Sequence, residues 1–214
     1  MRALAATIAA SAPPFRLVFG GGTALSRAHR LIRRMSEDID LKIVSEEPGS
    51  RQALRRLRTA ITKSLHDAGF EFDPENPIHR DSGNASRYTI YRLPYASVAS
   101  GTPALRPEIQ IETAVWPLRR PSIVLPVRSF IAEAYKRDPE VPAVDCVSLP
   151  EGMAEKFVAL TRRAGALFAE AGGPRDPTLV RPVTSFAAEF LADASELFRR
   201  SIVRNICRHC GAVL

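Results

Sequence analysis

The sequence predicts an α/β protein of the α+β kind, with a mixed sheet and a helical C-terminal region. Three observations lead to this prediction. A short apolar run ends in the three glycines Gly20–Gly22, and aspartates alternate with aliphatic residues at Asp38–Leu41. Beyond Ser148, apolar side chains recur at helical spacing. Strand and helix patterns interspersed in this way favour a sheet covered by helices.

The first half of the chain alternates between helix and strand patterns. Residues 2–11 are expected to form a short helix, and residues 16–19 a strand that enters the glycine turn. Residues 23–33 follow as a helix, and residues 38–44 as the strand that carries the aspartates. Residues 51–68 place leucine and isoleucine at helical spacing, which predicts an amphipathic helix.

Strand patterns dominate the middle of the chain. Residues 70–72 and 87–93 are predicted strands, separated by a polar, turn-rich segment. Residues 107–115 alternate most regularly, and residues 122–130 are expected to include a short strand in a proline-punctuated stretch. A capping-box pattern at Ser148–Glu151, with proline in the first turn, predicts that a helix begins there.

The two aspartates of the predicted strand are the leading candidates for chemistry. Side chains alternate faces along a strand, so Asp38 and Asp40 share one face while Ile39 and Leu41 share the other. Adjacent carboxylates repel each other unless a cation lies between them. Hard oxygen ligands suit Mg²⁺ that carries the phosphates of a nucleotide. The pair predicts a metal site, whereas an isolated Asp-Ile-Asp would be a solvated strand edge.

The glycine turn predicts a phosphate-binding site next to these aspartates. Backbone N–H groups of a glycine turn can face a phosphate, and the N-terminus of the following helix adds its dipole. Three glycines alone are more often only a turn. Because the turn and the aspartates occur together in this order and spacing, nucleotide chemistry is the more specific interpretation.

Composition limits the partners and the compartment. A net charge of +7 and a pI near 9.8 favour polyanionic partners such as RNA or nucleotide phosphates. Three cysteines, an odd number, offer no disulfide framework and fit a reducing cytosol. No run is long enough to span a membrane. We therefore expect a cytoplasmic protein with no membrane partner.

Two motifs resemble a known family. Gly21-Gly22-Thr23-x-Leu25, followed by Arg34-x-Ser36-x-Asp38-Ile39-Asp40-Leu41, resembles the AbiEii/MenT nucleotidyltransferase toxins of type IV toxin–antitoxin systems, which belong to the DNA polymerase β superfamily. The clear match covers about residues 17–43, and weaker matches reach toward residue 181. The resemblance implies a polymerase β-like nucleotidyltransferase catalytic domain at residues 1–145 and a helical region at residues 146–214.

The resemblance also implies a substrate, a cofactor and a set of site residues. The substrate would be an NTP, and the cofactor Mg²⁺ in a two-metal site. Ser36 can donate to a phosphate or cap a turn. Arg34 can bind phosphate in a bidentate manner or form a structural ion pair. The nucleotide-binding residues would be Gly21, Gly22, Thr23, Arg34, Ser36 and Lys156.

A third carboxylate should complete the metal site from a neighbouring strand. In the segment 107–115, Glu108, Gln110 and Glu112 share one face. Glu112 is the preferred ligand because the family carries an acidic residue on a strand in this region. Glu108 stays open as an alternative, and so does a merely polar outer face. The predicted metal ligands are thus Asp38, Asp40 and Glu112.

Lys156 is the fourth predicted catalytic residue. Ala154-Glu155-Lys156-Phe157-Val158-Ala159-Leu160 resembles the Glu-Lys-x-x-Ala-Leu helix of the family, whose lysine is thought to meet the nucleotide phosphates. A compact ammonium on a long stem suits a triphosphate. Farther on the resemblance weakens, since Thr184 and Ser185 stand where a tyrosine–aspartate pair would be expected, although Asp176 could substitute.

The resemblance implies a Mg²⁺-dependent nucleotidyltransferase that moves an NMP from an NTP to an acceptor. The acceptor would be RNA, such as a tRNA end, and the protein the toxin partner of a cognate antitoxin. An enzyme that nucleotidylates a protein hydroxyl is one alternative. A catalytically silent nucleotide- or RNA-binding member of the fold is the other, and the altered motif at Thr184 and Ser185 favours it.

Overall fold

A computed structural model describes residues 2–10, 15–32, 36, 38–45, 49–96 and 106–169 of the chain. The chain divides into two compact units, residues 1–148 and residues 149–214. The first unit holds a sheet and its helices. Of the second unit the structure describes the helix α5 (Leu149–Ala169).

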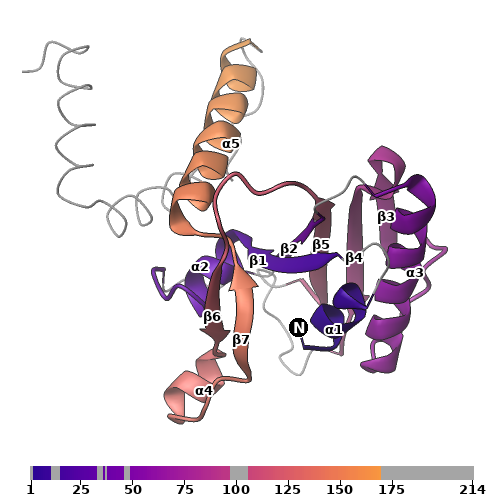
Figure 1. Ribbon diagram of the computed structural model, residues 1–214, viewed down its shortest axis with the longest axis horizontal. Coiled ribbons are helices and arrows are strands. Elements are labelled where there is room, and N and C mark those ends of the chain that lie inside the picture. Colours follow the sequence, from indigo (N-terminus) through magenta and orange to yellow (C-terminus); the bar gives the residue numbers. More distant parts are fainter. Residues whose placement is uncertain are drawn as a thin grey trace, which may run out of the picture. The chain divides into compact units, whose positions relative to one another are not determined.

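A mixed seven-stranded sheet forms the framework of the first unit, with the strand order β3-β4-β5-β2-β1-β7-β6 (Figure 1). β2 runs antiparallel to β1 but parallel to β5, and β7 runs parallel to β1. The strands are β1 (Arg16–Gly20), β2 (Asp38–Val44), β3 (Arg80–Gly83), β4 (Tyr88–Pro94), β5 (Glu108–Val115), β6 (Ile123–Val127) and β7 (Val141–Cys146). The mixed sheet confirms the predicted fold class.

Helices α1 and α3 contribute apolar side chains to the main core, which lies against one face of the sheet (Figure 1). On α3 the buried residues recur at helical spacing and meet Tyr91 and Leu93 of β4. The side chain of Ser50 caps α3 by accepting a hydrogen bond from Ala53 N at 3.1 Å. The helical elements are α1 (Arg2–Ala9), α2 (Gly21–Arg27), α3 (Arg51–Asp67), the 3₁₀ helix η1 (Asn84–Ser86) and α4 (Phe130–Ala134).

The burial of β2 decides which of its faces carries the charged residues. Leu41 and Ile43 are each 2% exposed and belong to the core. On the opposite face of the strand, Asp38, Asp40, Lys42 and Val44 are only partly buried. The core therefore fixes the register of β2, because a slip by one residue would bury the aspartates.

Several predicted boundaries are confirmed, and others are wrong. The strand at 38–44 is confirmed, whereas the helix predicted at 23–33 ends at Arg27. Residues 70–72 form no strand: the ring of Phe72 is buried and stacks on His66 with their centroids 4.5 Å apart. This segment packs through a side chain rather than through strand pairing. No sequence pattern predicts β3, α4 or β7.

Some predictions fall on residues that the structure does not describe. These include Arg34, the altered motif at Thr184 and Ser185, and Asp176. Among the described helices, none combines the length and the apolar character that crossing a bilayer requires.

Candidate active site

The strand register brings the predicted carboxylates together on one face of the sheet. Asp40 of β2 lies opposite Glu112 of β5, and Asp38 lies opposite Gln110. Neighbouring strands are about 4.8 Å apart, so these side chains project side by side. Glu108 lies opposite Pro94 of β4, two positions before Gln110, and thus farther from Asp40 than Glu112 is. The geometry favours Glu112 over Glu108 as the third carboxylate, and its role as a metal ligand stays a prediction.

The glycine turn approaches Asp40 so closely that it leaves no room for a side chain at position 21. Gly21 has a φ of +67°, in the region that favours glycine. A Cβ built on Gly21 would overlap the carboxylate oxygen Oδ2 of Asp40. In the sheet, Gly20 also pairs with Asp40, across the antiparallel strands β1 and β2. The backbone of the turn and one carboxylate of the site are therefore in direct contact.

Thr23 ties the helix after the turn to the start of the aspartate strand. Its Oγ1 donates a short hydrogen bond to the backbone oxygen of Asp38. This bond fixes α2 relative to β2, so the predicted phosphate-binding residues Gly21, Gly22 and Thr23 lie beside the aspartates. Ser36, two residues before Asp38, is partly buried.

Three side chains that the sequence analysis did not assign to the site hold two of its carboxylates. Arg106 Nη2 donates to Asp38 Oδ1 at 2.5 Å, and Arg106 Nη1 donates to Gln110 Oε1 at 3.1 Å. Gln110 Nε2 donates to Glu112 Oε1 at 2.7 Å. Tyr88 OH donates to Glu112 Oε2 at 2.8 Å. A continuous hydrogen-bond chain therefore crosses β2, β5 and β4, with Arg106 just before β5.

The environment of Tyr88 keeps its phenol protonated. Partial burial raises the pKa of Tyr88 above its ordinary value, and the hydrogen bond to Glu112 and the negative charges of Glu112 and Asp40 raise it further. The hydroxyl therefore serves as a donor to Glu112 across the physiological pH range.

The donor set fits a hard divalent cation in its chemistry. Three carboxylates on one sheet face offer the oxygen ligands that Mg²⁺ prefers, and the two-metal sites of phosphoryl-transfer enzymes are built from such ligands. In the arrangement described, no group of three or more His, Cys, Asp or Glu side chains within the described residues converges closely enough to hold a metal ion. Asp38, Asp40 and Glu112 are the residues that would hold one, and Asp38 and Glu112 already accept hydrogen bonds from Arg106, Gln110 and Tyr88.

Lys156 lies on α5, in the second unit. Its proximity to the carboxylates of the first unit stays a prediction.

The sequence pattern gives no signal for Arg106, which lies 68 positions after Asp38 and meets it only through the pairing of β2 with β5. Tyr88 and Gln110 could have been found, since they share the face of the carboxylates on their predicted strands.

A comparison with protein-family models agrees with the resemblance. A family model described as "Nucleotidyl transferase AbiEii toxin, Type IV TA system" matches residues 2–176. Among solved structures, MenT4, a nucleotidyltransferase toxin from Mycobacterium tuberculosis H37Rv, is 23% identical with a TM-score of 0.43. The match covers 84% of this chain and 59% of the MenT4 chain. No curated protein matches the sequence.

Proposed function

Because the chain belongs to the AbiEii family of nucleotidyltransferase toxins of type IV toxin–antitoxin systems, we propose that it transfers a nucleoside monophosphate from an NTP to RNA. The acceptor in this proposal is a tRNA end, the cofactor is Mg²⁺, and a cognate antitoxin neutralises the activity in the cytoplasm. The observation that carries the proposal is the pairing of Asp40 with Glu112, directly beside the backbone of Gly21.

The chemistry of this site follows from what nucleotidyl transfer requires. An acceptor hydroxyl, the α-phosphate and the leaving pyrophosphate must be in line, and spread negative charge must be stabilised. Mg²⁺ bound to Asp38, Asp40 and Glu112 would supply that stabilisation. The turn at Gly21 presents backbone next to the Asp40 carboxylate, where it can position the phosphates.

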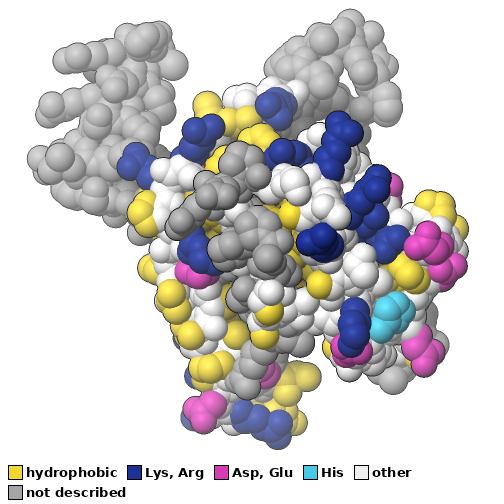
Figure 2. Space-filling model, turned by 45° about the vertical axis from the view of Figure 1, so that its right-hand side comes forward, with side chains coloured by type: hydrophobic (Ala, Val, Ile, Leu, Met, Phe, Trp, Pro, Cys, Tyr) yellow, Lys and Arg dark blue, Asp and Glu magenta, His cyan; other side chains and the backbone are white. Residues whose placement is uncertain are grey.

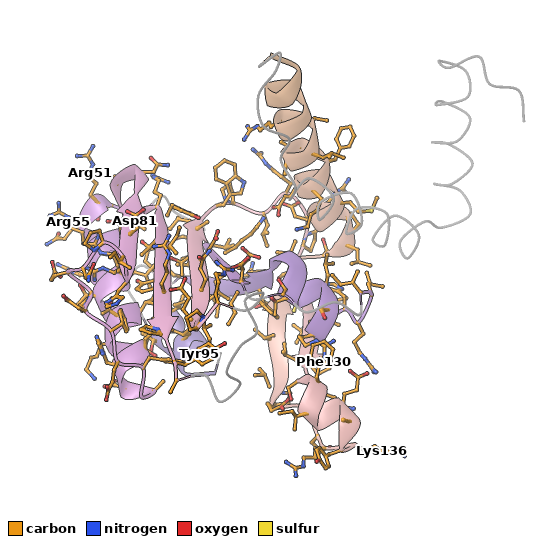
Figure 3. All side chains as sticks on the ribbon, turned by 180° about the vertical axis from the view of Figure 1, so that it is seen from behind. Arg51, Arg55, Asp81, Tyr95, Phe130 and Lys136 are labelled. Atoms are coloured by element: carbon orange, nitrogen blue, oxygen red, sulfur yellow. The ribbon has the colours of Figure 1, made fainter. Side chains whose placement is uncertain are left out.

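An exposed row of arginines on α3 supports a polyanionic acceptor. Arg51, Arg55 and Arg56 are exposed, and no described residue pairs with their guanidinium groups. Arg51 and Arg55, four residues apart, project from α3 in Figure 3, and Figure 2 shows basic side chains gathered on the side where α3 comes forward. Like charges four residues apart destabilise a helix, and so do positive charges near its N-terminus. The arginines therefore do not serve the stability of α3, and binding a polyanion is a role that fits them.

The test is incorporation of label from each NTP into total tRNA. The parent protein is expected to label tRNA with at least one NTP in a reaction that EDTA stops. Asp40→Asn is expected to lose this activity, whereas the matched change Asp81→Asn, on the edge strand β3 (Figure 3), is expected to keep it.

Other outcomes would contradict the proposal in specific ways. Label recovered in protein instead of tRNA would identify a protein-nucleotidylating enzyme. A parent protein that labels no acceptor with any NTP would be a silent member of the fold. Equal activity in Asp40→Asn and the parent would remove the carboxylates from the reaction.

A further inference from the structure

Arg106 places a positive charge where a cation of the active site would bind. Its Nη2 lies 2.5 Å from Asp38 Oδ1, and both side chains keep solvent access, with 40% of Arg106 and 31% of Asp38 exposed. A carboxylate oxygen that already accepts a charged N–H presents a weaker ligand to a metal ion, because donor and metal compete for the same lone pairs. Arg106 therefore competes directly with a metal at Asp38.

The remaining contacts of this network extend the competition to a second carboxylate. Gln110 accepts from Arg106 with its Oε1 and donates to Glu112 with its Nε2, and Tyr88 donates to the other oxygen of Glu112. Arg106 thus fixes which way the amide of Gln110 faces. If Arg106 leaves, the amide is released from that constraint, and Asp38 and Glu112 can turn toward a shared cation.

We propose that Arg106 is a displaceable counter-ion, which neutralises Asp38 in the metal-free protein and transfers to the triphosphate when a metal–nucleotide complex binds. This inference rests on the proposed function, since it assumes that the carboxylates receive a metal-bound NTP. It assigns Arg106 two partners in succession: first a carboxylate, then a phosphate.

Electrostatics favours this exchange. A guanidinium and a divalent cation on the same carboxylate repel each other, so metal binding weakens the contact between Arg106 and Asp38. The planar, five-donor guanidinium matches phosphate as well as it matches a carboxylate. A triphosphate that arrives with the metal therefore offers Arg106 a replacement partner at the moment it loses the first.

Two binding measurements test the exchange without relying on turnover. Mn²⁺ binding is followed by the loss of the free-ion electron paramagnetic resonance signal, and binding of magnesium tripolyphosphate by calorimetry. Arg106→Ala is expected to bind Mn²⁺ alone about tenfold more tightly than the parent, since a competing positive charge is gone. The same variant is expected to bind magnesium tripolyphosphate about tenfold more weakly, since a phosphate ligand is gone.

Two further variants complete the design. Arg106→Lys keeps the charge but cannot bond to Asp38 and Gln110 as a fork, so both affinities are expected between those of the parent and Arg106→Ala. Arg92→Ala is the matched control: Arg92 lies opposite Gln110 on β4 and donates to the backbone oxygen of Ile78 at 3.2 Å. It removes a nearby positive charge that makes no hydrogen bond or ion pair to Asp38, Asp40 or Glu112 in the described part of the chain, so smaller changes are expected.

The exchange predicts that Arg106→Ala raises the affinity for Mn²⁺ and lowers the affinity for magnesium tripolyphosphate. If Arg106→Ala lowers the affinity for both ligands or leaves both affinities unchanged, Arg106 forms an ordinary surface ion pair and the proposal is overturned. If the substitution raises both affinities, Arg106 competes with the metal but never binds phosphate, which overturns the exchange as well. Because neither measurement needs an acceptor, opposite signs together with no labelled tRNA would uphold this inference while the proposed function failed.

Discussion

At the scale of single residues, the contact between Gly21 and Asp40 is the tightest constraint on the site. Replacing Gly21 by alanine is expected to abolish nucleotidyl transfer and to lower stability, because the new Cβ overlaps Asp40 Oδ2 and the φ of +67° disfavours a side chain. Label incorporation and thermal melting, measured on the same preparation, check both effects.

Two other glycines separate these causes. Gly69 has a φ of +88° but an open surrounding, so Gly69→Ala is expected to lose about 1–2 kcal/mol of stability and no activity. Gly83 has a φ of −116° and also an open surrounding, so Gly83→Ala is expected to change neither. If Gly21→Ala retained transfer, the close approach of the turn to Asp40 would have no functional meaning.

The residues of the site differ in how far the sequence could predict them. Asp38 and Asp40 share a face because of the period of a strand, and this follows from local sequence alone. The pairing of Asp40 with Glu112 needed only one further assumption, that two predicted strands are neighbours. The role of Arg106 could not be predicted from the sequence, because its hydrogen bond to Asp38 depends on the parallel register of β2 and β5, which no local pattern specifies.

At the scale of elements, α5 carries the prediction about Lys156. Lys156→Ala is expected to reduce kcat/KM for the NTP about thirtyfold, or about 2 kcal/mol, as for the loss of a charge-assisted hydrogen bond to a phosphate. Lys156→Arg is expected to recover only part, because a planar fork does not replace a compact ammonium. Steady-state kinetics at varied NTP concentration provide the measurement.

Lys63 offers a control on another helix. It lies on α3, where its Nζ is 2.6 Å from Asp67 Oδ2, and both side chains are largely exposed. Lys63→Ala is expected to leave the kinetics unchanged, since an exposed pair of this kind contributes little. Parent-like kinetics in Lys156→Ala would remove Lys156 from the site and leave it a surface lysine.

Elements with a strong local pattern were predicted, and elements defined by distant partners were not. The alternation of 38–44 and the helical spacing of 51–68 correspond closely to β2 and α3. β7 contains Pro142 and Asp145 and is a strand because β1 and β6 flank it. The helix α4 begins where Ser129 accepts a hydrogen bond from Ala132 N. With only five residues, it is too short to show a helical repeat of apolar residues, and it lies in a proline-punctuated stretch that favours loops.

At the scale of the whole molecule, metal binding and folding should be linked. Mg²⁺ that binds only the folded carboxylates stabilises the protein by about 2.7 kcal/mol at a hundredfold excess over its Kd. This corresponds to a rise of at least about 5 °C in Tm for a chain of this length. Thermal melting with and without Mg²⁺ should therefore show an upward shift that EDTA reverses.

Two substitutions locate the source of that shift. Asp40→Asn is expected to abolish it, and Asp81→Asn to preserve it, because only the first removes a carboxylate that lies opposite Glu112. A shift of equal size in both variants would place the metal elsewhere in the molecule. The family match over residues 2–176 extends beyond the first unit, so the full chain is the right object for this measurement.

The absence of space at Gly21 also has a genetic consequence. Every missense change of a single base in a glycine codon introduces a residue with a Cβ, and at this position any Cβ meets the Asp40 carboxylate. If expression of the gene arrests growth, as a toxin would, survivors of that selection should carry diverse amino acids at codon 21. At Asp40, by contrast, survivors should include few exchanges that keep the carboxylate. The amino acids found in the survivors would thus distinguish a position where any side chain disrupts the site from a position where the site requires one particular side chain.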